Sequence, residues 1–171
     1  MSSRSRGSRG AKAPLGAAYE PALQLAYDQI ARRARSEVEL RRRLQKAGSD
    51  PDVIERVIER LKELRYLDDA AFAASRTRGL AARGFGPRAV AARLYQAGVA
   101  PGLAADGIGE TFGADEPRLA REALERRLRG RTFRELERRE RERLLRWLAG
   151  RGFSASAIAA ACEEQEEPWR D

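Results

Sequence analysis

The chain has 171 residues, of which 42% are hydrophobic, enough for one domain or a compact array of small modules. Its 34 Lys and Arg residues outnumber its 26 Asp and Glu residues, and the net charge of +8 predicts an anionic partner or an acidic protein surface. It contains no His or Asn, which excludes His-activated nucleophiles and the usual catalytic zinc sites. One Cys excludes an intramolecular disulfide, and no apolar run approaches the ~18 residues of a membrane span. We therefore expect a soluble cytoplasmic protein that is not an enzyme and needs no metal or cofactor.

The first segment, residues 1–19, contains four basic residues and no acidic one, which predicts a disordered basic arm. After it, apolar residues recur at helical spacing and no segment alternates with the period of a strand, so the chain is predicted to be all-α. Three amphipathic helices are expected near 21–34, 69–83 and 116–129.

Local signals mark where helices begin and end. Ser36 and Glu39 form a capping box for a helix that Gly48 then ends, and Asp50-Pro51 is typical of the start of the next helix.

The chain also resembles itself when it is shifted. A shift of 50 residues aligns Leu40, Leu44 and Gly48 with Val90, Leu94 and Gly98, and a further 54 aligns these with Leu144, Leu148 and Gly152. This pattern predicts three tandem three-helix units at 20–67, 68–113 and 114–165, followed by a short acidic tail at 166–171. Because one unit buries little alone, we expect stacked copies to share a continuous core in an elongated, curved array.

Arginine clusters are the candidate binding residues. Those in the first unit are Arg32, Arg33, Arg35, Arg41, Arg42 and Arg43, and those in the second are Arg76, Arg78, Arg83, Arg88 and Arg93. Glu37 and Glu39 offer local partners in the first unit, so contact with a ligand and a solvated, locally paired face are equally good interpretations there. The block 70–105 has no acidic residue, which favours binding to phosphates or to carboxylates of a partner.

A third arginine-rich block has a different interpretation. Residues 118–151 hold 13 Arg and six Glu, which predicts pairs four residues apart on an exposed helix from about Glu135 to Ala149. Trp147 in this block is expected to pack in the core, and Cys162 to be a small buried hydrophobe.

The adjacent carboxylates Asp68 and Asp69 suggest either a metal or acid–base pair or the cap of the following helix. Their place between Leu67 and a run of apolar residues favours capping. Ser36, Glu39, Gly48, Gly98 and Gly152 are likewise assigned structural roles in caps and turns.

Several of these motifs resemble the bacterial RecX regulatory proteins. They are Ser36-Glu37-x-Glu39-Leu40 with Leu44 and Gly48, Tyr66-Leu67-Asp68-Asp69-x-x-Phe72-Ala73, Arg83-Gly84 with Gly86, Leu94 and Gly98-Val99, and Arg151-Gly152-Phe153. The resemblance runs from about Tyr19 to Gln165 and does not cover the basic arm. Arg65 stands where the family commonly has Gly, a departure that affects a turn.

The resemblance implies an all-helical modulator of the RecA recombinase that acts in recombination, DNA repair and the SOS response. Such proteins bind the RecA nucleoprotein filament in its groove and mostly inhibit its ATPase, strand exchange and coprotease activities. We therefore expect RecA and nonspecifically bound DNA as partners, and a monomeric state. The alternatives are a DNA-binding protein that uses one helix-turn-helix-like unit without RecA, and, less favoured, a nuclease with a carboxylate metal site.

Overall fold

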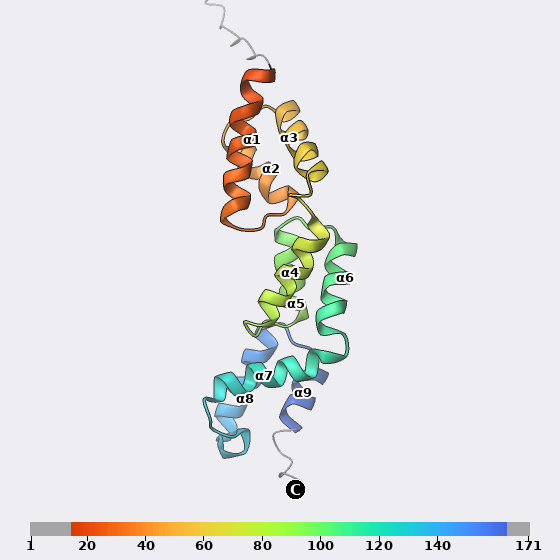
Figure 1. The fold of residues 1–171 in the computed structure, drawn as a ribbon. Coiled ribbons are helices and arrows are strands. Elements are labelled where there is room, and N and C mark those ends of the chain that lie inside the picture. The colour runs from red at the N-terminus through yellow and green to blue at the C-terminus, as the bar shows by residue number, and fades with distance from the viewer. Residues whose placement is uncertain (1–14, 164–171) are drawn as a thin grey trace, which may run out of the picture. The chain divides into compact units, whose positions relative to one another are not determined.

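The computed structural model describes residues 15–163, and every regular element within this range is helical (Figure 1). The elements are α1 (Leu15–Arg32), α2 (Glu37–Lys46), α3 (Pro51–Glu63), α4 (Asp69–Ala81), α5 (Pro87–Gln96), α6 (Pro101–Phe112), the 3-10 turn η1 (Gly113–Asp115), α7 (Glu116–Leu128), the 3-10 turn η2 (Phe133–Glu135), α8 (Arg138–Gly150) and α9 (Ala155–Glu163). The predicted all-α class is confirmed. In the described range, no helix is both long and apolar enough to cross a membrane. The acidic tail and residues 1–14 of the expected arm lie outside the described residues.

The expected boundary of the arm at residue 19 is wrong, because α1 begins at Leu15. Ala17 and Ala18 are strong helix formers. Tyr19 and Ala18 also pack against the buried core, and the guanidinium of Arg56 lies 5.0 Å from the centre of the Tyr19 ring. The half-buried Ala18 and Tyr19 thus favour a helix inside the segment that was expected to be the arm.

Three helices end in the same turn, at the glycines that the sequence repeat aligns. The backbone φ angles of Gly48, Gly98 and Gly152 are +85°, +78° and +92°. In each turn the amide after the glycine donates to a carbonyl five residues back, from Ser49 to Leu44, Val99 to Leu94 and Phe153 to Leu148. This is the hydrogen-bond pattern of a Schellman turn, which glycine favours because its left-handed conformation carries no Cβ clash.

The chain divides into two compact units, of which the first comprises residues 1–35 and 40–67. Its described part holds α1, α3 and most of α2 around a separate core. Leu40, Leu44, Val57, Ile58 and Leu61 are its most deeply buried large side chains. Fully burying an aliphatic side chain contributes about 1.5–3 kcal/mol, so this small core gives the three helices their main cohesion.

The second unit comprises residues 36–39 and 68–171, and one core runs through its helices α4 to α9. Leu80 from α4, Leu94 from α5, Leu124 from α7 and Leu148 from α8 are all in this core, together with Phe153. The second group of helices, α4–α6, and the third group, α7–α9, therefore share one hydrophobic core. The first group has its own buried cluster, so that the expectation of one core through all three groups is wrong.

Within the second unit, the start of one helix packs against a glycine turn in two places. The Ser36 hydroxyl donates to the carbonyl of Ala97, next to Gly98. Similarly, the amide of Gly86 donates to the carbonyl of Arg151 at 2.8 Å, and the amide of Arg88 donates to that of Gly152 at 3.2 Å. Glycine suits both turns, because a Cβ on Gly98 would meet the side chain of Val38 and a Cβ on Gly152 would meet the backbone of Ala89.

The helix expected from about Glu135 is shorter than the sequence suggests, because α8 begins at Arg138. Phe133 and Leu136 are buried, which turns the chain inward before the helix can start. Two capping interactions follow: Glu135 accepts from the amide of Thr132 at 3.1 Å and Glu140 from the amide of Glu137 at 3.2 Å.

Candidate anion-binding surface

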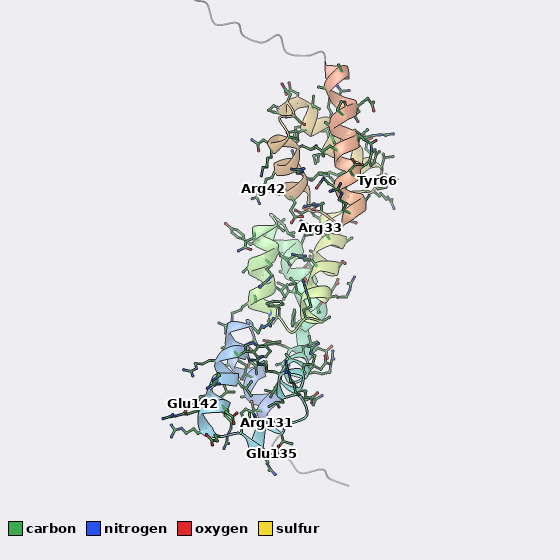
Figure 2. The ribbon with its side chains drawn as sticks, turned by 90° about the vertical axis from the view of Figure 1, so that its left-hand side faces the viewer. Arg33, Arg42, Tyr66, Arg131, Glu135 and Glu142 are labelled. Carbon is green, nitrogen blue, oxygen red and sulfur yellow. The ribbon has the colours of Figure 1, made fainter. Side chains whose placement is uncertain are left out.

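The structure gives the first-unit arginines mostly local contacts. Arg41 forms an ion pair with Glu55, Arg35 donates to the side-chain oxygen of Gln29 at 2.8 Å, and Arg33 donates to the carbonyl of Ala34 at 3.2 Å. Arg32, Arg42 and Arg43 are exposed, and Figure 2 shows Arg42 projecting from α2. Arg41 is therefore paired with Glu55 of α3, a partner other than the neighbouring Glu37 and Glu39 that the sequence suggests.

The acid-free block of the second unit is not one surface. Arg76 and Arg78 lie on α4 on either side of the buried Thr77, and both are exposed, with no side-chain hydrogen bond or ion pair inside the described range. Arg88 lies at an apolar groove of about 590 Å³ between α5 and α6, which is also lined by Tyr95. These three arginines are open to a partner, whereas Arg93 stacks on the Phe85 ring and Arg83 lines a cavity together with Arg126.

Aromatic rings and guanidinium groups alternate across the second unit. The guanidinium of Arg93 lies 4.0 Å from the centre of the Phe85 ring, and that of Arg151 lies 4.4 Å from the same ring. Arg151 also lies 4.9 Å from the Trp147 ring, and Arg127 lies 5.7 Å from it. A cation over an aromatic face is stabilised while it keeps its full charge. The stack therefore orders three arginines from α5, α7 and the end of α8.

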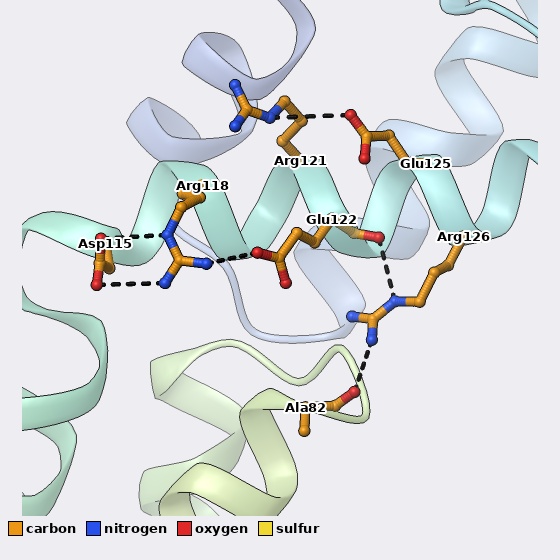
Figure 3. Close-up of polar contacts among 7 residues, drawn as sticks. All are labelled: Ala82, Asp115, Arg118, Arg121, Glu122, Glu125 and Arg126. Carbon is orange, nitrogen blue, oxygen red and sulfur yellow. Dashed lines mark hydrogen bonds and ion pairs between the residues drawn. The ribbon is translucent and has the colours of Figure 1, made fainter.

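Next to this stack is a cavity of about 360 Å³ in which four arginines converge. Its lining residues are Ala82, Arg83, Gly84, Ala123, Arg126, Arg127, Trp147 and Arg151, with no carboxylate among them. Arg126 donates from Nη1 to the carbonyl of Ala82 at 2.7 Å and from Nε to that of Glu122 at 3.1 Å (Figure 3). We call Arg83, Arg126, Arg127 and Arg151 the four-arginine pocket.

Other arginines of α7 are neutralised by neighbouring carboxylates. Figure 3 shows Arg118 between Asp115, at 3.3 Å, and Glu122, at 2.5 Å, while Arg121 lies 3.8 Å from Glu125. The hydrogen bond from Arg118, reinforced by its charge, lowers the pKa of Asp115 below its ordinary value. Local pairing is thus observed for part of the 118–151 block.

Similar pairing occurs around α8. Arg131 donates through both terminal nitrogens to the carboxylate of Glu140, each at 3.1 Å, and Arg138 lies 3.0 Å from Glu142. The bond from Arg131, with help from the amide of Glu137, lowers the pKa of Glu140. Figure 2 labels Arg131, Glu135 and Glu142 in this part of the second unit.

The two adjacent carboxylates have separate structural roles. Asp68 caps α4, because its carboxylate accepts from the amide of Ala71 at 2.9 Å. Asp69 was expected to cap the same helix but accepts from the amide of Glu37 at 2.8 Å, since it is already the first helical residue. Ser36 accepts from the amide of Glu39 at 3.1 Å. Between residues 15 and 163, no group of three or more His, Cys, Asp or Glu side chains is placed to hold a metal.

Sequence reasoning missed the four-arginine pocket. Arg126, Arg127 and Arg151 were grouped with the paired arginines, and Trp147 was expected only to pack, although it is half-buried and stacks on two guanidinium groups. The spacing of the charges could have indicated it. Arg126 has one acidic residue four positions before it, Glu122, and the carboxylate of Glu122 is already paired with Arg118. Arg126 is therefore left without a carboxylate at helical spacing.

The described residues thus form an all-α protein of short helices with exposed basic side chains. Comparison with known proteins gives the family. Residues 22–61 match the model of the first three-helix domain of RecX, and residues 68–108 match that of the second. The regulatory protein RecX of Halorhodospira halophila is 37% identical over 155 residues, covering 89% of this chain and 94% of the relative. RecX of Syntrophotalea carbinolica is 34% identical over 151 residues, covering 85% and 94%.

The chain belongs to the RecX family of regulatory proteins, which are not enzymes. The resemblance seen in the sequence motifs is thereby confirmed. A crystal structure of RecX from Lactobacillus salivarius shares the fold with a TM-score of 0.73 at 20% identity, covering 88% of this chain and 98% of that one.

Proposed function

We propose that this protein binds the RecA nucleoprotein filament in its groove and inhibits ATP hydrolysis, strand exchange and coprotease activity. Membership of the RecX family supports the choice of partner. The observation that carries the contact is the pair Arg76 and Arg78, which are exposed and have no partner in the described part of the chain. Such side chains are free to make bidentate contacts with carboxylates or phosphates.

The mechanism we propose is steric and electrostatic. A chain of helical units in the groove obstructs strand entry and filament extension, while its arginines contact acidic surfaces of RecA and phosphates of the bound DNA. Opposite charges speed the encounter and fix its register, so both contacts are expected to weaken as ionic strength rises. In this proposal the protein acts as a monomer in the cytoplasm.

RecA-dependent ATP hydrolysis on single-stranded DNA tests the proposal. Adding the protein should lower the rate, and the double reversal Arg76→Glu with Arg78→Glu should weaken that inhibition. The matched control is Arg139→Glu with Arg146→Glu, which makes the same change of charge at two exposed positions of α8. Its inhibition should stay close to that of the unmodified protein, and circular dichroism should show equal helix content in all three.

Two outcomes count against this reading. Equal losses in the two double variants would show a general charge effect and move the contact away from α4. Unchanged RecA ATP hydrolysis and filament assembly, combined with binding to a defined duplex sequence, would favour the alternative of a DNA-binding protein that works without RecA.

A further inference from the structure

We propose that the four-arginine pocket is a binding site for phosphate groups, supplied either by a nucleic-acid strand or by a free polyphosphate such as a nucleotide. Its members are Arg83, Arg126, Arg127 and Arg151, and it lies wholly within the second unit. The proposal deepens the function proposed above, in that it names a site for the DNA of the filament. It is nevertheless a property of this chain alone and can be tested without RecA.

The contrast between neighbouring arginines on α7 is the first argument. Arg118 and Arg121 are neutralised by carboxylates, whereas Arg126 donates to the backbone carbonyls of Glu122 and Ala82. A carbonyl orients a guanidinium group but leaves its positive charge in place. Arg83 is held in the same way, because its Nε donates to the carbonyl of Gly79 at 3.1 Å.

Aromatic contacts make the second argument. Arg151 lies against both the Phe85 and Trp147 rings, and Arg127 lies against Trp147. These faces restrict the rotamers of long side chains, so less entropy is lost when an anion binds. As with the backbone carbonyls, they hold the cations without compensating them.

Four like charges around one cavity repel each other, and none of the residues from 15–163 that line the cavity carries a carboxylate to offset the repulsion. An oxyanion removes this cost and gains charge-assisted hydrogen bonds, which are about twice as strong as neutral ones. The planar forks of Arg match the oxygens of phosphate in pairs. At about 360 Å³ the cavity also falls within the ~300–1,000 Å³ typical of ligand pockets.

The turn at Gly84 fits the site to α7. The φ of Gly84 is +76°, and a Cβ there would lie 3.3 Å from the Cβ of Ala123 and 3.6 Å from Nη2 of Arg126. Glycine lets the turn that carries Arg83 approach the helix that carries Arg126. The close approach of these two backbone segments therefore places Arg83 near Arg126.

The experiment measures binding of the full chain to a fluorescein-labelled (dT)20 strand by anisotropy, without RecA, over a series of KCl concentrations. The site variant is Arg126→Gln with Arg127→Gln, and the matched control is Arg118→Gln with Arg121→Gln on the same helix. We expect the site variant to bind at least tenfold more weakly. Its salt slope should fall by about 1.4, for two lost phosphate contacts at ~0.7 each on a single strand. The control should change less than twofold.

A conservative variant separates the site from folding. Arg126→Lys with Arg127→Lys keeps both charges but loses the paired N–H donors of each guanidinium group, so its affinity should lie between those of the unmodified protein and the site variant. Trp169→Phe leaves Trp147 as the only tryptophan. In that background, emission of Trp147 should change on addition of unlabelled (dT)20, and this change should be absent when the site variant is combined with it.

Competition with pyrophosphate and ATP distinguishes the two sources of phosphate. Displacement of the strand at millimolar pyrophosphate or ATP indicates a site that also takes free polyphosphate, and resistance to both indicates a strand site. Equal weakening of the site variant and the control, or strand binding without any change in Trp147 emission, would overturn the proposal. Neither of these results would test the inhibition of RecA, which is measured separately by RecA-dependent ATP hydrolysis.

Discussion

A Cβ atom on Gly98 would lie 2.4 Å from the Cβ of Val38, so the turn after α5 and the start of α2 meet without room for a side chain. Gly98 also has a φ of +78°, in the left-handed region. Gly98 therefore combines a lack of space for a Cβ with a left-handed backbone. A comparison with Gly48 separates the costs of these two constraints. Gly48 has a φ of +85°, yet a Cβ there would meet nothing within 4 Å.

We predict that Gly98→Ala destabilises the protein by about 2–5 kcal/mol, the sum of left-handed strain of roughly 1–2 and overpacking of roughly 1–3 kcal/mol. Gly48→Ala should cost only the strain, about 1–2 kcal/mol. Urea unfolding followed by circular dichroism measures both. Equal losses for the two variants would show that the contact with Val38 relaxes at no cost.

Arg65 gives a prediction of the opposite sign. It follows the end of α3 with a φ of +57°, which is costly for a side chain with a Cβ, and it is exposed. Arg65→Gly should therefore stabilise the protein by about 0.5–1 kcal/mol, because glycine carries no Cβ in this conformation. The control Glu59→Gly, at an exposed position inside α3, should destabilise it by about 1 kcal/mol. A loss of stability in Arg65→Gly would mean that its side chain makes an important contact.

Thr77 is fully buried on α4, and its hydroxyl has no hydrogen-bond partner in residues 15–163. A buried unpaired hydroxyl costs about 1–3 kcal/mol, and valine has nearly the same shape. We predict that Thr77→Val raises the free energy of unfolding by about 1 kcal/mol. Thr111→Val is the control, because the Thr111 hydroxyl donates to the carbonyl of Gly107 at 3.0 Å. A gain in the control as large as that in Thr77→Val would contradict the argument.

Periodicity and local caps predicted the helices well. The turn glycines, the Asp50-Pro51 start and the helices α4 and α7 follow from chemistry within a few residues, which a sequence displays directly. The sequence did not predict where a helix begins when that start depends on packing against residues far away in the chain. The early start of α1 depends on Tyr19 meeting Arg56, and the late start of α8 depends on burial of Phe133.

The candidate site shows the same division. An acid-free block identified Arg76 and Arg78 as exposed cations, because the absence of local carboxylates is visible in the sequence. The four-arginine pocket joins Arg83 to Arg126 and Arg151, which lie 43 and 68 positions later. No spacing rule connects these residues, because packing of α7 and α8 against the turn after α4 brings them together.

Ion pairing on the second unit predicts a response to acid. Arg131 and the amide of Glu137 lower the pKa of Glu140, so the folded protein holds this proton less tightly than the unfolded chain does. The stabilisation is complete above the ordinary glutamate pKa and is lost as the pH falls through the lower folded value. Carbon-detected NMR titration of the Glu140 carboxyl group should show the lowered pKa, and Arg131→Gln should raise it toward the ordinary value. Arg138→Gln is the control, because Arg138 pairs with Glu142. An equal shift of the Glu140 pKa in both variants would assign the effect to net charge, whereas a shift confined to Arg131→Gln would assign it to the two hydrogen bonds at 3.1 Å.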